Sequence, residues 1–439
     1  MTDDEATAFP DTPAGRAVVW FLRHAATNGR DLTIEEIVEH MRFEPPWTPE
    51  DSLERFREGA PQDRRIIEIR SPSASEVEYF EVDPAGRRWR ALCRVEDAPP
   101  HRITFFEFRA DLGPGVELRQ ATAEDTAKLA EVERQAPIIA GDLRSTYDRG
   151  DDFLSFARLM EENVFYVVEK DGELLGLYGA ATHTVRSDGK LHRAMLAHHL
   201  RIPAAQEKKG YFSALNMRLF DHYTEIYGPW WKGGWYPYGY VLLANVAGMR
   251  LGAPGSWSVG ALRALLDCEA LAGEDHGAVA APDDAGRIAG IINACHDTQA
   301  MFVPYTVESL TARMDRAPDL YTWSDVLVGD GAVVGVWPSG LRVITEGEGV
   351  RREAVRASML DHGFVPGAED EFERIIRAWG GRLLDAGHTE LSFITSEPSP
   401  AYPILERLAF QMDAFDFKMA IPEPEDAKTN GLYVDPIYF

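Results

Sequence analysis

A basic, glycine-containing segment near the middle of the chain has the composition of an anion-binding loop. Residues 206–214 read Gln-Glu-Lys-Lys-Gly-Tyr-Phe-Ser-Ala, and the residues after Gly210 are expected to form a helix. The first N–H groups of a helix have no partner within it, and the helix dipole favours a negative charge beside them. A glycine lets the backbone approach a phosphate closely. The segment therefore predicts a diphosphate site around Lys208, Lys209 and Gly210.

A pair of histidines precedes this loop. His198 and His199 lie in the segment 191–203, LHRAMLAHHLRIP, which we expect to be a strand. Histidine titrates near neutrality and can therefore accept or donate a proton in a reaction. Neighbouring residues of a strand point to opposite faces, so we expect only one of the two to face a cleft. A structural role for both is the alternative interpretation.

An aromatic cluster follows the loop. The segment 227–240, YGPWWKGGWYPYGY, holds three tryptophans and four tyrosines. Aromatic side chains beside glycines can build a pocket for apolar or cationic groups. Packing within a core at a strand between two domains is the alternative. The predicted ligand-binding residues are Trp230, Trp231, Trp235, Tyr236 and Tyr238.

The overall composition limits the classes of partner. The 439 residues include 45 Lys and Arg against 71 Asp and Glu, a formal net charge of −26, which repels nucleic acid. A loop of backbone N–H groups can still bind a diphosphate in an acidic protein. The three cysteines lack disulfide or metal-ligand spacing, and the N-terminus is acidic and polar. No apolar run reaches 18 residues. We therefore expect a cytoplasmic protein with no metal and no membrane span.

The first quarter of the chain predicts a small α+β domain. A threonine–proline cap at Thr12-Pro13 opens a helical region over 14–58. Four segments rich in aromatic and β-branched residues follow, and they predict an antiparallel meander over 64–70, 76–83, 87–95 and 101–110. This layout resembles the cystatin-like group that includes the nuclear transport factor 2 and ketosteroid isomerase folds. Its expected role is structural or substrate-shaping, with an independent catalytic role left open.

The remaining residues predict two runs of strands and helices in the same order. The first run has a strand and helix over 116–133, a hairpin over 164–179 with an Asp171-Gly172 turn, a strand over 191–203, a helix after the 206–214 loop, and a helix and turn over 240–252. The second run has a strand and helix over 279–293, a hairpin over 321–337, strands over 352–364, 389–395 and 413–421, and helices over 369–386 and 399–410.

Both runs carry a family resemblance. The segment 116–133, VELRQATAEDTAKLAEVE, resembles the opening strand and helix of the Gcn5-related N-acetyltransferase (GNAT) superfamily, and SPAYPILERLAF over 399–410 resembles its closing motif. Together the two runs cover about 300 residues. The resemblance implies an α+β fold with two tandem GNAT-like mixed-sheet domains behind the cystatin-like domain. The implied domains are 1–113, 114–270, 271–425 and a C-terminal tail, 426–439.

The resemblance implies acetyl-CoA, or another acyl-CoA, as the cofactor. Its pantetheine would pair with the strand 191–203, and a backbone N–H near Leu200 or Ile202 would stabilise the oxyanion. Asn245 would bond to the pantetheine. The second domain has GFVPGAEDEF over 363–372 at the equivalent place, without Lys or Arg, and is expected to have lost CoA binding. The implied diphosphate residues are Gln206, Lys208, Lys209, Gly210, Tyr211, Phe212 and Ser213.

The implied chemistry is direct attack of an amine on the thioester. His198 or His199 would act as the base. The tyrosine that usually protonates the thiolate in this family falls on Gly248 in the first domain and on Leu405 in the second. Tyr240, or alternatively Tyr238, is the expected substitute. The aromatic cluster would bind the acceptor.

The sequence therefore predicts an N-acetyltransferase for a small-molecule amine. Aminoglycosides, polyamines and protein lysines all stay open as acceptors, and the oligomeric state is not predicted. One alternative is an acyl-CoA-binding protein without turnover, because neither run keeps the tyrosine. Another is a scaffold with two degenerate domains, in which the N-terminal domain binds a ligand.

Overall fold

The computed structural model describes residues 8–43, 48–58, 64–84, 86–230, 233–242, 257–347, 349–420 and 430–438. The chain divides into two compact units. The smaller unit comprises Met1–Arg119, Val168–Gly176 and Ala204–Gly233, and the larger unit comprises Gln120–Val167, Leu177–Pro203 and Gly234–Phe439. Each unit therefore contains segments that are far apart in the sequence.

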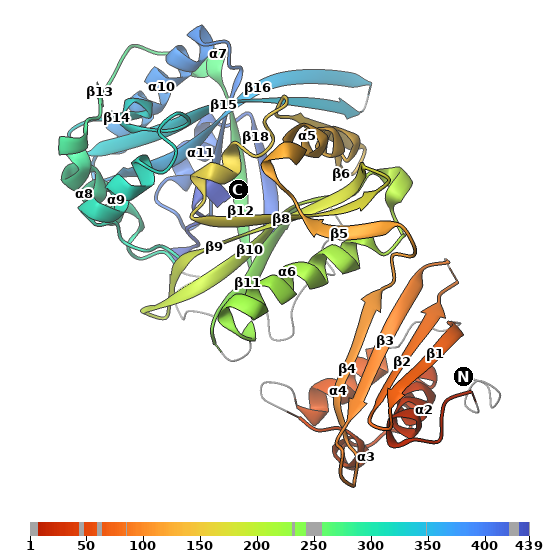
Figure 1. The fold of residues 1–439 in the computed structure, drawn as a ribbon. Helices are drawn as coiled ribbons and strands as arrows, with labels where there is room; N and C mark the ends of the chain where they lie inside the picture. The colour runs from red at the N-terminus through yellow and green to blue at the C-terminus, as the bar shows by residue number, and fades with distance from the viewer. Residues whose placement is uncertain are drawn as a thin grey trace. The chain divides into compact units, whose positions relative to one another are not determined.

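The N-terminal part of the smaller unit is a helical layer on an antiparallel sheet (Figure 1). The helices are α2 (Pro13–Ala26), α3 (Ile34–His40) and α4 (Pro49–Glu58), and the sheet has the order β1-β2-β3-β4, formed by Arg65–Ser73, Glu76–Val82, Arg88–Val95 and Ile103–Ala110. The Thr12 side chain caps α2 by accepting a hydrogen bond from the amide of Gly15 at 3.1 Å. The predicted helices and four-stranded meander are thus confirmed, while the cystatin-like assignment stays a prediction.

The core of this part lies between α2 and the sheet. Val77 and Tyr79 of β2 and Cys93 of β3 are fully buried and pack with Val18 of α2. Alternate residues of each strand face the helix, so one face of the sheet is apolar. A second cluster around Ile37 joins α2, α3 and α4.

A 14-stranded mixed sheet runs through the rest of the described residues, and its strands β10 to β18 belong to the larger unit. Its order is β13-β14-β15-β16-β17-β12-β18-β11-β10-β9-β8-β5, with β7 beside β15 and β6 beside β7. The bounds are β5 Val116–Gln120, β6 Ile138–Ala140, β7 Leu143–Asp148, β8 Glu162–Lys170, β9 Glu173–Ser187, β10 Lys190–Arg201, β11 Tyr236–Leu242, β12 Trp257–Asp267, β13 Ala278–Val279, β14 Val326–Val328, β15 Ala332–Gly347, β16 Val350–Phe364, β17 Glu390–Thr395 and β18 Gln411–Met419. The predicted mixed α+β class is confirmed.

Helices flank this sheet. They are α5 (Thr126–Gln135), α6 (Tyr211–Tyr227), α7 (Cys268–Leu271), α8 (Ala285–His296), α9 (Val307–Met314), α10 (Glu369–Asp385) and α11 (Tyr402–Leu408). Figure 1 shows α10 on one side of the β13–β16 strands and α8 and α9 on the other. Phe372 and Ile376 of α10 are fully buried with Met359 of β16 and Phe393 of β17. Gly363 of β16 allows α8 to approach, because a Cβ there would lie 2.9 Å from the Cα of Ile292.

Strand β11 differs from the sequence prediction. We predicted a helix over 240–252, but Tyr240 and its neighbours up to Leu242 belong to a strand. Residues 240–242 pair antiparallel with β18 and continue a strand whose first half pairs in parallel with β10, and this pairing outweighs local helix propensity. Asn245 and Gly248 lie outside the described residues.

Strand β12 joins distant parts of the sequence. It precedes the predicted domain boundary at 270/271 and pairs with β17 and β18, which follow that boundary. The tandem arrangement and its boundaries stay predictions.

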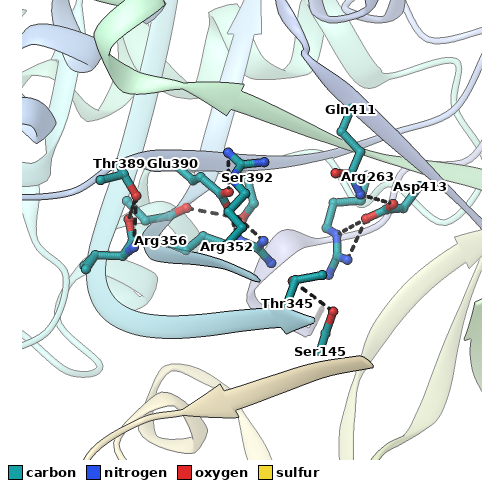
Figure 2. Close-up of polar contacts among 12 residues, drawn as sticks. Ser145, Arg263, Thr345, Arg352, Arg356, Thr389, Glu390, Ser392, Gln411 and Asp413 are labelled. Carbon is teal, nitrogen blue, oxygen red and sulfur yellow. Dashed lines mark hydrogen bonds and ion pairs between the residues drawn. The ribbon is translucent and has the colours of Figure 1, made fainter. Parts of the chain in front are cut away.

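Buried ion pairs connect the strands of the larger unit (Figure 2). Glu390 of β17 is 2% exposed and accepts from Arg356 of β16 at 2.7 Å and from Arg352 at 2.8 Å. Arg263 of β12 donates to Asp413 of β18 at 2.7 Å. Removing one partner of a buried pair leaves the other charge without compensation.

We expect Glu390→Ala to destabilise the protein by about 3–5 kcal/mol, because Arg356 would stay buried without its carboxylate. The measurement is the urea midpoint of unfolding. The matched control is Glu353→Ala, whose partner Arg342 lies at 2.5 Å with both side chains almost half exposed. That exposed pair should be worth less than about 1 kcal/mol. Equal losses in the two variants would contradict the prediction.

Candidate functional site

The predicted anion-binding loop lies directly before α6 in the smaller unit. Lys208 and Lys209 are exposed, so the loop is not buried within a sheet. Gly210 is the N-cap of α6, with φ of 86°, and no side chain caps the helix. Lys208 also has a positive φ, 62°, which is uncommon for a residue with a side chain. The loop therefore leads directly into the N-terminus of a 17-residue helix, where the helix dipole favours a negative charge.

Two constraints favour glycine at position 210: its positive φ and the lack of space for a side chain. A Cβ at this position would lie 2.9 Å from the Cβ of Ala110, at the end of β4. The side chains of Lys208, Lys209 and Tyr211 line a cavity of about 230 Å³ beside this point. Phe212 and Ser213 occupy the first turn of the helix, and Gln206 accepts a hydrogen bond from the Lys209 ammonium at 2.7 Å.

The equivalent place in the second run is occupied by the chain's own carboxylates. The Glu371 carboxylate, in the first turn of α10, accepts from the amides of Asp330 and Gly331 at 2.9 and 2.7 Å. Glu369 accepts from the amide of Gly367 at 3.2 Å. An external anion would meet negative charge here, which agrees with the expected loss of CoA binding, though that loss stays a prediction.

The two histidines of β10 contact each other instead of facing opposite sides. His199 has φ of 51°, and the register of β10 with β9 shifts after His198, so the strand alternation breaks at this pair. The two Nδ1 atoms are 2.8 Å apart. Gly179 of β9 makes room for the His198 ring, because a Cβ there would lie 2.7 Å from its Cε1 atom.

Hydrogen bonds assign the protons of this pair. Arg149 donates to Nε2 of His199 at 3.2 Å, so Nδ1 of His199 carries the proton and donates to Nδ1 of His198. The proton of His198 is then on Nε2, which is buried. Burial, with Arg149 and Arg201, lowers the pKa of His198 to about 3, and burial lowers the pKa of His199 well below its usual value. Both rings are therefore neutral, and hydrogen bonds occupy both lone pairs.

Aromatic and charged groups surround the pair. Phe156 stacks on His199 at 4.4 Å between ring centroids, and Phe165 lies against His198 at 5.3 Å. Glu133 is 1% exposed and pairs with Arg149 at 3.2 Å. The catalytic role of the histidines stays a prediction.

Strands β10 and β11 stop pairing just before the histidines. Within the described residues, their parallel register ends at Ala197 opposite Gly239, and residues 240–242 of β11 continue against β18. Leu200 is the residue before the last residue of β10, and Ile202 follows the end of the strand. Both lie beyond the point where the pairing ends. A strand edge that loses its neighbour has backbone groups available to another extended molecule.

The aromatic cluster is divided between different surroundings. Trp235 is fully buried, and Trp230 belongs to the smaller unit. Tyr240 packs against Phe417 at 5.4 Å between ring centroids. Burial raises the pKa of Tyr240 to about 12 despite the nearby Arg201. Trp231 lies outside the described residues, and Tyr236 faces His192 at 5.3 Å between ring centroids.

Tyr238 faces a cavity of about 130 Å³ within the larger unit. Its hydroxyl lies 3.1 Å from Nε2 of His183, on β9. The remaining wall comes from β18, α9 and the C-terminal segment 432–435. Other residues of the wall include Ser309, Arg313, Arg316, Phe417, Tyr305, Tyr433 and Asp435.

The charges of this cavity centre on one buried arginine. Arg313 is 6% exposed and lies between two carboxylates, with Asp435 at 2.7 Å and Asp361 at 3.0 Å. Burial raises the pKa of Asp435, but Arg313 outweighs burial and keeps it below the ordinary value. Burial lowers the pKa of His183 to about 4. The lining carries two guanidinium groups, Arg313 and Arg316, and two carboxylates, Glu161 and Asp435, so its formal charges balance beside a neutral imidazole.

Most residues of this cavity could not be predicted from the sequence. His183, Arg313 and Asp435 come from three segments separated by more than a hundred residues, so spacing could not group them. The one available signal was the apolar C-terminal segment, whose Tyr433 is buried against His296 and Phe302.

In the described part of the chain, no group of three His, Cys, Asp or Glu side chains could hold a metal ion. No helix in that part is long and apolar enough to cross a membrane. The three cysteines are buried thiols.

No protein-family model and no curated protein matches the chain. Among solved structures, Saccharomyces cerevisiae N-myristoyltransferase with bound myristoyl-CoA is similar at 10% identity and TM-score 0.50, over 74% of this chain and 85% of that chain. Another structure of that enzyme with myristoyl-CoA has 10% identity and TM-score 0.52, over 74% and 81% of the two chains. A GCN5-related N-acetyltransferase from Kribbella flavida has 14% identity and TM-score 0.36, over 69% and 71%. Over the matched 74%, this chain has the fold of N-myristoyltransferase.

Proposed function

We propose that the protein is an acyl-CoA-dependent N-acyltransferase acting on the amine of a small molecule, with acetyl-CoA as the expected donor. The observation that carries this proposal is the end of β10–β11 pairing at Ala197, on a strand that continues directly into the basic loop before α6. The open strand edge suits the amides of pantetheine, and the loop suits the diphosphate. The fold shared with N-myristoyltransferase, whose structures hold myristoyl-CoA, supports the same class.

The acceptor amine is proposed to enter the cavity lined by Tyr238. In register, Tyr238 lies opposite Leu196, one residue before the pairing ends, so the cavity wall adjoins the open strand edge. The tyrosine rings of the wall favour a cationic molecule. One amine of that molecule must be neutral to attack.

The proposed chemistry uses the Tyr238–His183 pair. The neutral amine attacks the thioester carbon, forming the C–N bond, and the oxyanion accepts from a backbone N–H near Leu200 or Ile202. The amine nitrogen then loses a proton to Tyr238, whose own proton passes to His183. Collapse of the intermediate breaks the C–S bond, and the proton returns through Tyr238 to the thiolate, giving amide and CoA.

A second candidate function is acyl-CoA binding without turnover. It is favoured by the hydrogen bonds that occupy both lone pairs of the His198–His199 pair. Thiol release with a panel of amines separates the two candidates, since a binding protein releases none. Calorimetry with acetyl-CoA and myristoyl-CoA would show which donor binds. The third candidate, a scaffold whose N-terminal domain binds a ligand, would give no heat with either.

We expect Lys208→Glu to weaken acetyl-CoA binding by roughly tenfold or more, because a charge-assisted phosphate contact becomes a repulsion. Calorimetry measures the dissociation constant. Lys208 is preferable to Gly210, because any side chain at Gly210 approaches Ala110. Lys190→Glu, an exposed lysine on β10, is the matched control. Equal affinity in both variants would show that the loop is misassigned.

We expect Tyr238→Phe to lower turnover by roughly 100-fold with little change in acyl-CoA affinity, because the proton path is lost. Steady-state thiol release and calorimetry provide the two readouts. Tyr402→Phe, whose exposed hydroxyl donates to Glu406, is the control. Tyr240→Phe discriminates between the sequence-based and structure-based assignments. A large loss of turnover in Tyr240→Phe alone would overturn the role of Tyr238.

The pH dependence follows from the low pKa of His183. Because burial lowers this pKa to about 4, the imidazole stays neutral as the pH falls through 6.5. We expect the ratio of wild-type to His183→Gln turnover to stay constant between about pH 8 and 5.5. Taking the ratio removes the titration of the acceptor amine, which affects both proteins. A ratio that falls with a midpoint near 6.5 would contradict the assignment.

A further inference from the structure

The cavity beside the loop is lined by two parts of the smaller unit that are distant in the sequence. The turn before β3 contributes Arg87, the first residue of β3 is Arg88, and the loop before α6 contributes Lys208 and Lys209. Asp111 is the single carboxylate in the lining. The volume, about 230 Å³, far exceeds the roughly 10–15 Å³ that one water requires.

These four cations retain unused hydrogen-bond donors. Arg87 donates through Nε to Asp83 at 2.5 Å, and Arg88 donates through Nε to Asp111 at 2.7 Å. Within the described residues, the terminal guanidinium nitrogens of both arginines donate no hydrogen bond, and the Lys208 ammonium has no polar partner. The carboxylates therefore orient the arginines and leave the forked ends available.

The charge of the cavity opposes that of the whole chain. The protein has a formal net charge of −26, yet four cationic side chains line this cavity against one carboxylate. Arginine forks match the oxygens of a phosphate in pairs. A phosphate monoester offers three acceptor oxygens and nearly two negative charges, which fits this set of donors.

We propose that this cavity binds the 3′-phosphate of CoA, with Arg87 and Arg88 of the N-terminal part as its ligands. The inference rests on the proposed function, in which the adjacent loop binds the diphosphate. In CoA, one ribose carries the diphosphate on its 5′ oxygen and the monoester on its 3′ oxygen. A second phosphate site next to the diphosphate loop therefore matches the connectivity of the molecule. The N-terminal part then selects CoA over 3′-dephospho-CoA.

The test compares CoA with 3′-dephospho-CoA by calorimetry on the full-length protein. Wild type should bind CoA roughly tenfold or more tightly. Arg88→Ala should remove most of that preference by weakening CoA and leaving dephospho-CoA unchanged, and Arg87→Ala should act in the same direction. The matched control is Arg94→Ala, on the same strand and paired with Glu76 at 2.6 Å, which should keep the full preference.

Each outcome separates this inference from the proposed function. If wild type binds both molecules equally, or if Arg88→Ala weakens both equally, the 3′-phosphate site is wrong while acyl-CoA binding stands. If wild type binds neither, the proposed function fails. Arg88→Lys guards against a folding defect, because it keeps the charge, and it should retain part of the preference.

Discussion

A β-strand has two edges, and β11 uses them for different partners along its length. Among the residues that the structure describes, its first half pairs with β10 and its second half with β18, so the β10–β11 pairing ends at Ala197 and Gly239. Backbone groups that lose a neighbour must find another partner or water. The positive φ of His199 and the register shift against β9 occur at the same place. The proposed donor site depends on this opening, because Ala194–Ala197 of β10 are paired with β9 on one side and with β11 on the other.

The histidine pair is best understood as a support for that opening. A residue at φ of 51° costs free energy, and it persists only where its surroundings hold it. His199 is held by Arg149 on one nitrogen and by His198 on the other, and Phe156 stacks on its ring. Gly179 leaves the space that His198 fills. His198 and His199, which the sequence predicts as catalytic bases, thus support the local backbone structure.

Local elements could be predicted from the sequence, and long-range arrangements could not. The meander of the N-terminal part and the Asp171-Gly172 turn follow from periodicity and turn chemistry, and both residues of that turn have positive φ. The helix predicted from Tyr240 was wrong at its start, because residues 240–242 pair with β18, a strand distant in the sequence. Arg313 and Asp435 meet only in the folded chain, so no spacing could indicate their cavity.

The net charge of −26 has opposite effects on the two proposed substrates. It attracts a cationic acceptor and repels CoA, but at physiological ionic strength charges beyond about 8 Å are largely screened. Local charge therefore decides each site. Arg313 lies between two carboxylates in one cavity, whereas Arg87, Arg88 and the loop lysines dominate the other. A site for CoA must offset the negative potential of the whole protein with positive charge close to the ligand. The cavity beside the loop does so with cations from both the loop and the N-terminal sheet.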